Sequence, residues 1–264
     1  MAREQVSFRF APGAPRVGIR ELTGHDERFV RDTSTSTAIG LIDRLVETPG
    51  GAPWRSAAEL TASDRDRLLA AIYRLTYGPQ VESTSRCGRC DSQFDLSFSL
   101  DDLMAAIERT PAAGAVERLP DGTFRTGGGV RFRLPTGQDE LAVATLPAGE
   151  AARTLLDRSV IEAPPTIDAL AAVEELIEEV ASVIDLDLDT RCPECGAAQA
   201  VHFDVQYYLL RMLEQERNQI AREIHRIASS YGWSLGETLG LGRSERRFFV
   251  ELIESERSQT RRSR

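Results

Sequence analysis

Lysine is absent from this sequence of 264 residues, and all 32 basic residues are arginine. Codon usage in a GC-rich genome accounts for such a bias, and selection for planar, multidentate arginine contacts at protein interfaces is the alternative. The 41 acidic residues outnumber the arginines and leave a net charge of −9. A chain this acidic is a poor general binder of nucleic acid or of anionic membranes.

Long apolar runs and a secretion signal are also missing. No stretch approaches the ~18–20 consecutive apolar residues that a membrane span requires, and the first residues, MAREQVSFRF, lack the basic-then-apolar pattern of a signal peptide. We therefore expect a cytoplasmic protein whose four cysteines are reduced or metal-bound. Hydrophobic residues still make up 41% of the chain, which suffices for a core, and the length suggests about two folded units at roughly 150 residues each.

Signatures of common enzyme classes are missing too. The chain has no G-x-S-x-G motif, no P-loop and no dinucleotide-binding fingerprint, and the glycines at 127–129 lack the Lys-Ser/Thr of a phosphate cradle. His25, His202 and His225 are expected on a helix cap, a strand and a helix, so they do not assemble a site. We expect no catalytic residues and a protein that is not an enzyme.

Three short blocks occur twice, in the same order. RELTGHDE at 20–27 matches RLPTGQDE at 133–140, LIDRLV at 41–46 matches LLDRSV at 155–160, and RCGRC at 86–90 matches RCPEC at 191–195. One shared block is compatible with chance, whereas three in register indicate an internal duplication. We predict two homologous halves, residues 5–112 and 115–206, joined by a Pro/Gly-rich connector.

Each predicted half begins with strand-like alternation and continues into helices. The T-G-x-D-E pattern is typical of a helix N-terminal capping box, so Asp26, Glu27, Asp139 and Glu140 are expected to cap helices and not to catalyse. Further helices over 63–77 and 167–184 precede the cysteine pairs. The expected fold class is α+β, with two pseudo-symmetric halves that share a four-cysteine zinc site and a C-terminal α-helical arm.

The two C-x-x-C motifs carry the strongest chemical signal. Cys87 and Cys90 form one pair, and Cys192 and Cys195 form the other. Two such turns supply the four thiolates of a closed tetrahedral zinc site, and the duplication explains why one pair comes from each half. The alternatives are a dithiol redox centre, which requires one reactive pair, and two disulfides, which a cytosolic chain disfavours. We predict one structural zinc ion per chain, held by all four cysteines.

Residues 207–258 are predicted to form a separate helical module. From residue 207 onward the 11 arginines and 8 acidic residues give a net charge of +3, against −12 for the preceding 206 residues. A long amphipathic helix over 207–233 precedes two shorter helices, an outline that also suits a helix-turn-helix motif. Glutamates along the last helix oppose DNA binding and favour protein docking. The candidate contacts are the aromatic and arginine residues Trp233, Arg246, Arg247, Phe248 and Phe249. The alternative is that Trp233 and Phe248 pack the module's own small core.

This ending resembles a known family. The stretch Glu223-Ile-His225 to Tyr231-Gly-Trp233-Ser, followed by Arg246-Arg247, is similar to the ending of the baseplate-protein family of T-even-like phages, which is shared with bacterial contractile, phage tail-like injection systems. LTASDRDRLLAAIYRLTYG before the first C-x-x-C, VRFRLPTGQDE, and C-P-x-C-G followed by FDV resemble the same family.

The resemblance implies a non-enzymatic structural or assembly protein of the tail baseplate. It would act by protein–protein interaction with baseplate or hub and spike proteins, as part of the particle or in transient association with it. The alternative function is a zinc-ribbon/helix-turn-helix regulator that binds nucleic acid, which a steep loss of affinity with salt would reveal.

Overall fold

The computed structural model of the chain describes residues 3–11, 16–48, 54–109, 116–162 and 168–262. The predicted connector between the halves falls mainly on residues 110–115 and lies outside the described residues. Helices and strands are interspersed along the chain up to residue 204, and the last described elements are all helices. None of the described helices is long and apolar enough to cross a membrane.

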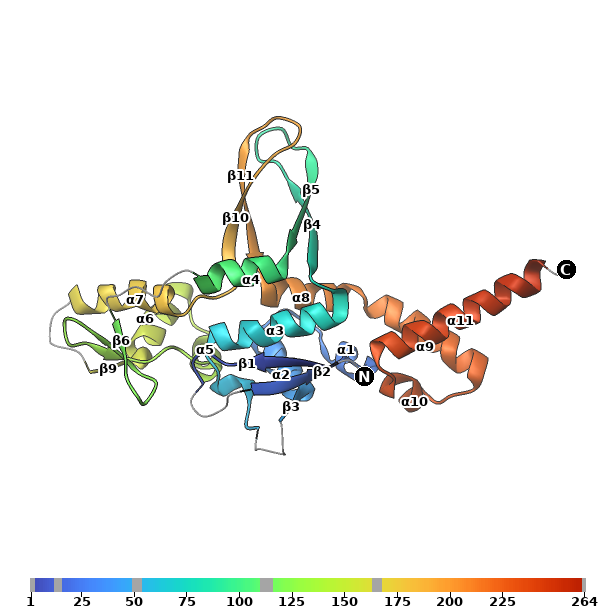
Figure 1. Cartoon of the computed structure of the whole chain (residues 1–264), viewed down its shortest axis with the longest axis horizontal. Helices are drawn as coiled ribbons and strands as arrows, with labels where there is room; N and C mark the ends of the chain where they lie inside the picture. The colour runs from blue at the N-terminus through green and yellow to red at the C-terminus, as the bar shows by residue number, and fades with distance from the viewer. Residues whose placement is uncertain (1–2, 12–15, 49–53, 110–115, 163–167, 263–264) are drawn as a thin grey trace.

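In its described residues the first half, drawn in blue to green in Figure 1, contains a small antiparallel sheet and four α-helices. Strands pair in the order β1-β2-β3. Helix α3 begins after the Thr61 N-cap and ends at Gly78, whose φ of 88° suits glycine. The elements are β1 (Arg3–Ser7), β2 (Arg16–Arg20), α1 (Gly24–Phe29), α2 (Thr35–Leu45), β3 (Val46–Glu47), η2 (Ala57–Glu59), α3 (Ala62–Tyr77), β4 (Gln80–Arg86), β5 (Gln93–Ser99) and α4 (Leu100–Arg109).

The second half has a four-stranded antiparallel sheet of order β6-β7-β8-β9 beside its helices. Asp121-Gly122, a dipeptide typical of tight turns, joins β6 and β7 in a hairpin, and Gly122 has a φ of 85°. Phe124, Phe132 and Val173 form its small core, which Phe10 of the first half joins. The elements are β6 (Val116–Arg118), β7 (Phe124–Thr126), β8 (Arg131–Phe132), α5 (Gly137–Val143), α6 (Ala148–Ser159), β9 (Val160–Glu162), α7 (Asp168–Val180), β10 (Asp185–Arg191), β11 (Ala198–Asp204) and α8 (Val205–Gln215).

Two hairpins of identical length and register project side by side from the body (Figure 1). In the first, Gln80 pairs with Ser99 and Arg86 with Gln93; in the second, the residues 105 positions later pair in the same way. The second hairpin is anchored to the first half at its base, where buried Asp66 of α3 accepts a 2.7 Å hydrogen bond from the N–H of Ile184. Burial raises the pKa of Asp66 to about 7.

The prediction of one long helix over 207–233 is wrong in one respect. The segment is divided at Glu216 into α8 and α9 (Arg217–Tyr231). Helix α8 does not belong to a separate module, since its Leu209, Leu210 and Leu213 are buried in the core of the first half. The remaining helices, α9, α10 (Leu235–Gly240) and α11 (Arg243–Arg262), extend away from the body (Figure 1). We call residues 217–262 the C-terminal arm.

Candidate metal centre

The two cysteine pairs meet at the far ends of the projecting hairpins. The sulfur atoms of Cys87, Cys90, Cys192 and Cys195 all lie within 4.8 Å of one another. Two contacts cross between the hairpins, with 3.7 Å from Cys87 to Cys195 and 3.7 Å from Cys90 to Cys192. The sequence prediction that each half contributes one pair to a common cluster is therefore confirmed as geometry.

These separations fit a metal ion better than a disulfide. Zn–S bonds of about 2.3 Å at tetrahedral angles place neighbouring sulfurs about 3.8 Å apart. A disulfide requires about 2.05 Å, and all four cysteines are free thiols. The cluster can therefore hold one tetrahedral metal ion, and all four sulfurs would be used in holding it.

Both turns are built in the same way. The N–H of Asp91 donates to the carbonyl of Cys87, as the N–H of Gly196 does to that of Cys192, at 3.0 and 2.9 Å. Asp91 and Gly196 have φ values of 61° and 68°, in the left-handed region. The arginine just before each pair also contributes: Arg86 donates to the carbonyl of Asp91, and Arg191 donates to that of Gly196, each at 3.3 Å. These shared contacts place the two sulfurs of each turn on one side.

The electrostatics of the thiols differ across the cluster. The backbone N–H groups of Cys90 and Arg89 lower the pKa of Cys87, and Ser92 lowers the pKa of Cys90 to about 6. The N–H of Ala197 acts in the same direction on Cys195, but burial and the three neighbouring sulfurs raise its pKa to about 11. Four adjacent thiolates repel one another, so the set retains protons unless a cation offsets the charge.

The surroundings of the cluster are partly apolar. Cys87 and Cys192 are buried, and they pack with Phe94 and Val201. Cys90 faces solvent. A half-buried position between two hairpin tips is typical of a structural site, which holds chain segments together and keeps no open coordination position.

The predicted capping boxes are confirmed, but each also forms a clamp that sequence reasoning missed. Thr23 and Asp26 cap α1, while Thr136 and Asp139 cap α5. In addition, Arg20 binds both carboxylate oxygens of Asp26, at 2.7 and 3.2 Å, and Arg133 binds those of Asp139, at 2.6 and 2.8 Å.

A second arginine completes each clamp. Arg44 lies 3.2 Å from Asp26, and Arg158 lies 2.8 Å from Asp139. All four arginines stand at matching positions of the repeated blocks, and that match was the available signal. The clamps are structural, since both carboxylates are buried and fully engaged.

The proposed contacts on the arm require a correction. Arg246 is fully buried, paired with Glu27 and with Glu223, so its side chain is not available to a partner. Arg243 is also buried against Glu27, which turns two arginines of the supposed DNA-reading helix toward the body.

The other candidate contacts lie nearer the surface. The Trp233 and Phe249 rings pack edge to face at 5.1 Å and are half-buried. Arg247 lies 3.7 Å from Glu216. Phe248 is 59% exposed.

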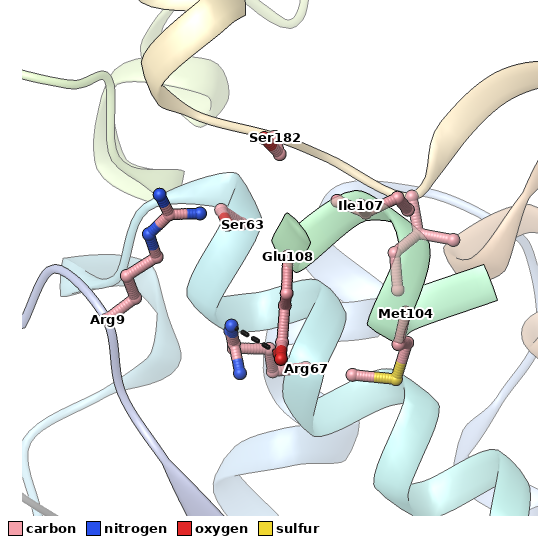
Figure 2. Close-up of a pocket in the computed structure, with 8 residues that line it drawn as sticks. Arg9, Ser63, Arg67, Met104, Ile107, Glu108 and Ser182 are labelled. Carbon is pink, nitrogen blue, oxygen red and sulfur yellow. Dashed lines mark ion pairs between the residues drawn. The ribbon is translucent and has the colours of Figure 1, made fainter. Parts of the chain in front are cut away.

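One small pocket has walls of charged and apolar side chains. It lies between α3 and α4, where Arg67 and Glu108 pair at 2.7 Å, and Met104, Ile107 and Ser182 line it (Figure 2). Its volume of ≈ 20 Å³ is room for a single water molecule. The histidines do not converge: His25 and His225 are exposed, and His202 lies 3.1 Å from Asp185 and 3.2 Å from Asp187 on the second hairpin.

Comparisons of the chain with protein-family models, with curated proteins and with solved structures return no match.

Proposed function

We propose that the protein is an internally duplicated scaffold closed by one structural zinc ion. The observation that carries this proposal is the convergence of four sulfurs, two from each of two hairpins with the same register. The matching turns and the matching arginine clamps support a common origin of the halves, because equivalent residues make equivalent contacts at both places. Zinc fits best among metals that prefer four thiolates at tetrahedral positions.

The function of this scaffold is structural or assembly work, without catalysis, at the baseplate of a contractile, phage tail-like injection system. The resemblance of the sequence blocks supports that assignment. The arm supports action by protein–protein contact, because it projects from the body and carries exposed Tyr231, Leu235, Phe248 and Leu252. Tyr231 and Phe248 belong to the aromatic residues that are enriched at protein interfaces.

Metal analysis of the purified chain tests the scaffold. We expect one zinc per chain, and complete loss of bound zinc in both double variants, Cys87→Ser with Cys90→Ser and Cys192→Ser with Cys195→Ser, because neither pair alone supplies four ligands. Ser85→Ala on the same hairpin is the matched control and should keep the metal. Metal-free protein with four freely titratable thiols would refute the zinc proposal. Retention of zinc by either cysteine variant would exclude a site shared between the halves.

The baseplate role is tested by deleting the protein from a contractile-tail gene cluster and examining particles by electron microscopy. We expect sheath and tube without a complete baseplate, with assembly restored by the wild-type chain and not by Cys192→Ser. Normal baseplates in the deletion would refute the role, whereas salt-sensitive binding of the purified chain to DNA would favour the regulator.

A further inference from the structure

Helix α1 docks on the arm in the way that helix α5 docks on the first half. Thr23, before α1, forms an antiparallel bridge with Gly242, and Thr136, before α5, forms one with Thr61. Glu27 of α1 then pairs with Arg246, as Glu140 of α5 pairs with Arg65 at 2.6 Å. Gly242 and Arg246 stand the same distance along the chain, 181 residues, after Thr61 and Arg65.

The close approach of each docked helix follows the same offset. A Cβ on Gly24 would lie 3.2 Å from the Cα of Leu239, and one on Gly137 would lie 3.0 Å from the Cα of Ala58. Leu239 also follows Ala58 by 181 residues. Backbone bridge, ion pair and glycine contact therefore agree that the segment α10–α11 occupies, around α1, the place that η2–α3 occupies around α5.

One face of α3 is covered by helix α4. Arg67, Ala71 and Arg74 lie on this face, at spacings of four and three residues. Arg67 pairs with Glu108, and Arg74 lies 3.2 Å from Asp101 and 3.1 Å from the sulfur of Met104. Ala71 is 0% exposed. Figure 2 shows Met104, Ile107 and Glu108 of α4 over α3.

On α11 the corresponding face is open. The positions 181 residues later hold Phe248, Leu252 and Ser255, and Phe248 and Leu252 are 59% and 37% exposed. The Phe248 ring continues through Phe249 to Trp233, with centroid distances of 5.9 and 5.1 Å. The arm thus places large apolar side chains where α3 has an arginine and an alanine, yet no described α4-like helix lies on them.

The charge beside this stripe identifies the kind of partner. Glu245 and Glu251 are exposed, one on each side of Phe248 on the helix surface. A second arm packed face to face would bring these glutamates together, and an anionic membrane would be repelled, whereas lysine or arginine beside an apolar stripe would be attracted.

We propose that the stripe of Phe248 and Leu252, with Glu245 and Glu251 beside it, binds a basic amphipathic helix of a partner protein. That helix lies on α11 as α4 lies on α3, with apolar side chains three residues apart in the manner of Met104 and Ile107. The proposal rests on the proposed function only in taking the arm as the partner-binding element. Binding of a helix along such a stripe is a recurrent mode of peptide recognition.

The probe is a pair of hydrocarbon-stapled peptides, because an unconstrained helix of this length is marginal in water. One has the sequence of Leu100–Arg109, and the other carries Asp101→Lys, Asp102→Lys and Glu108→Lys. Fluorescence anisotropy with the full chain should show the basic peptide binding at least tenfold more tightly than the acidic one. Phe248→Ser with Leu252→Ser should weaken it at least tenfold. Leu141→Ser on α5, where the side chain is about as exposed as that of Leu252, should leave it unchanged.

A charge-reversal variant provides a second measurement on folded protein. Glu245→Lys with Glu251→Lys should reverse the preference between the two peptides. Equal binding of both peptides to the wild-type chain, or binding indifferent to the Phe248 and Leu252 changes, would overturn the proposal. So would a dimer in sedimentation that Phe248→Ser dissociates, because a second copy would then occupy the stripe.

The same variants separate this inference from the proposed function. If baseplates assemble normally with Phe248→Ser and Leu252→Ser while peptide binding is lost, the stripe does bind a basic helix. The proposal that the arm mediates baseplate assembly is then wrong. If assembly requires both residues but the basic peptide does not bind, the arm functions in assembly and its partner is not a basic helix.

Discussion

The two halves of the molecule use the same buried local contacts, but their corresponding helices are buried to very different extents. Asp26 and Asp139 are each clamped by two arginines and capped by a threonine in the same manner. Helix α2, however, buries Ile39, Leu41, Ile42 and Leu45, whereas α6 buries only Ser159. The first half is central, with α5, α8 and the arm packed around it, whereas the β6–β9 sheet, α6 and α7 of the second half lie at one end (Figure 1). Local sequence sets the cap and clamp, while the neighbours set the burial.

The largest expected difference between the halves concerns Glu27 and Glu140. Glu27→Ala leaves the buried guanidinium groups of Arg243 and Arg246 without their shared carboxylate, which should lower the free energy of unfolding by about 3–5 kcal/mol. Glu140→Ala leaves one buried guanidinium, that of Arg65, without its partner, and the Glu140 side chain is 24% exposed. This variant should therefore lose only about 1–3 kcal/mol of the free energy of unfolding.

Urea unfolding at pH 7 measures both values. Glu47→Ala is the control, because its ion pair with Arg3 is exposed and contributes about 0–1 kcal/mol. Equal losses for Glu27→Ala and Glu140→Ala would contradict the view that the arm interface is the more deeply buried of the two docking contacts.

A smaller effect is expected from the clamps, in acid. Burial would raise the pKa of Asp139, but hydrogen bonds from Arg133, Thr136 and Arg158 outweigh it and hold the pKa well below its usual range. A carboxyl group whose pKa is depressed in the folded state adds stability above its unfolded pKa, about 3.9, and that stability is lost as pH falls toward the folded pKa. Stability should therefore decline below about pH 4, and Asp139→Asn should flatten that decline by roughly 1–3 kcal/mol.

Asp26 is the matched position in the other half. Burial opposes ionisation there too, and hydrogen bonds from Arg20 and Thr23 again lower the pKa. Asp26→Asn should consequently also reduce the loss of stability that occurs as the pH falls below about 4. Thermal unfolding from pH 2 to pH 7 distinguishes the outcomes, and an unchanged acid limb in both variants would show that the clamps do not contribute to acid sensitivity.

Short-range features of the fold were predictable from sequence. The capping boxes, the turn at Asp121-Gly122, the end of α3 at Gly78 and the convergence of two C-x-x-C motifs all depend on residues a few positions apart or on an evident repeat. In each case the physical cause is local, namely backbone conformation, capping of N–H groups or reach of two sulfurs from one turn.

The missed features depend on residues far apart in the chain. Periodicity from 207 to 233 favours one helix, but α8 packs into the first-half core and α9 packs beside α1 and α11, so the chain turns at Glu216. The sequence pattern predicts that Arg246 is exposed and contacts a partner. In the structure it is buried, because Glu27, more than two hundred residues earlier in the chain, lies opposite it. No local pattern specifies a partner at that separation.

The smallest expected effect compares the two metal-binding turns. Asp91 and Gly196 occupy the same left-handed position, which a side chain adopts at a cost of about 1 kcal/mol. Asp91→Gly should therefore raise stability by about 0.5–1 kcal/mol, since the pair that Asp91 forms with Arg86 is largely exposed and contributes little. Gly196→Asp should lower stability by a similar amount. Thermal unfolding of the zinc-loaded variants measures both, and opposite signs for exchanges at equivalent positions would confirm that the two turns share one backbone geometry. Destabilisation by both would mean instead that the Asp91 carboxylate supports its own turn in a way that glycine at 196 does not require.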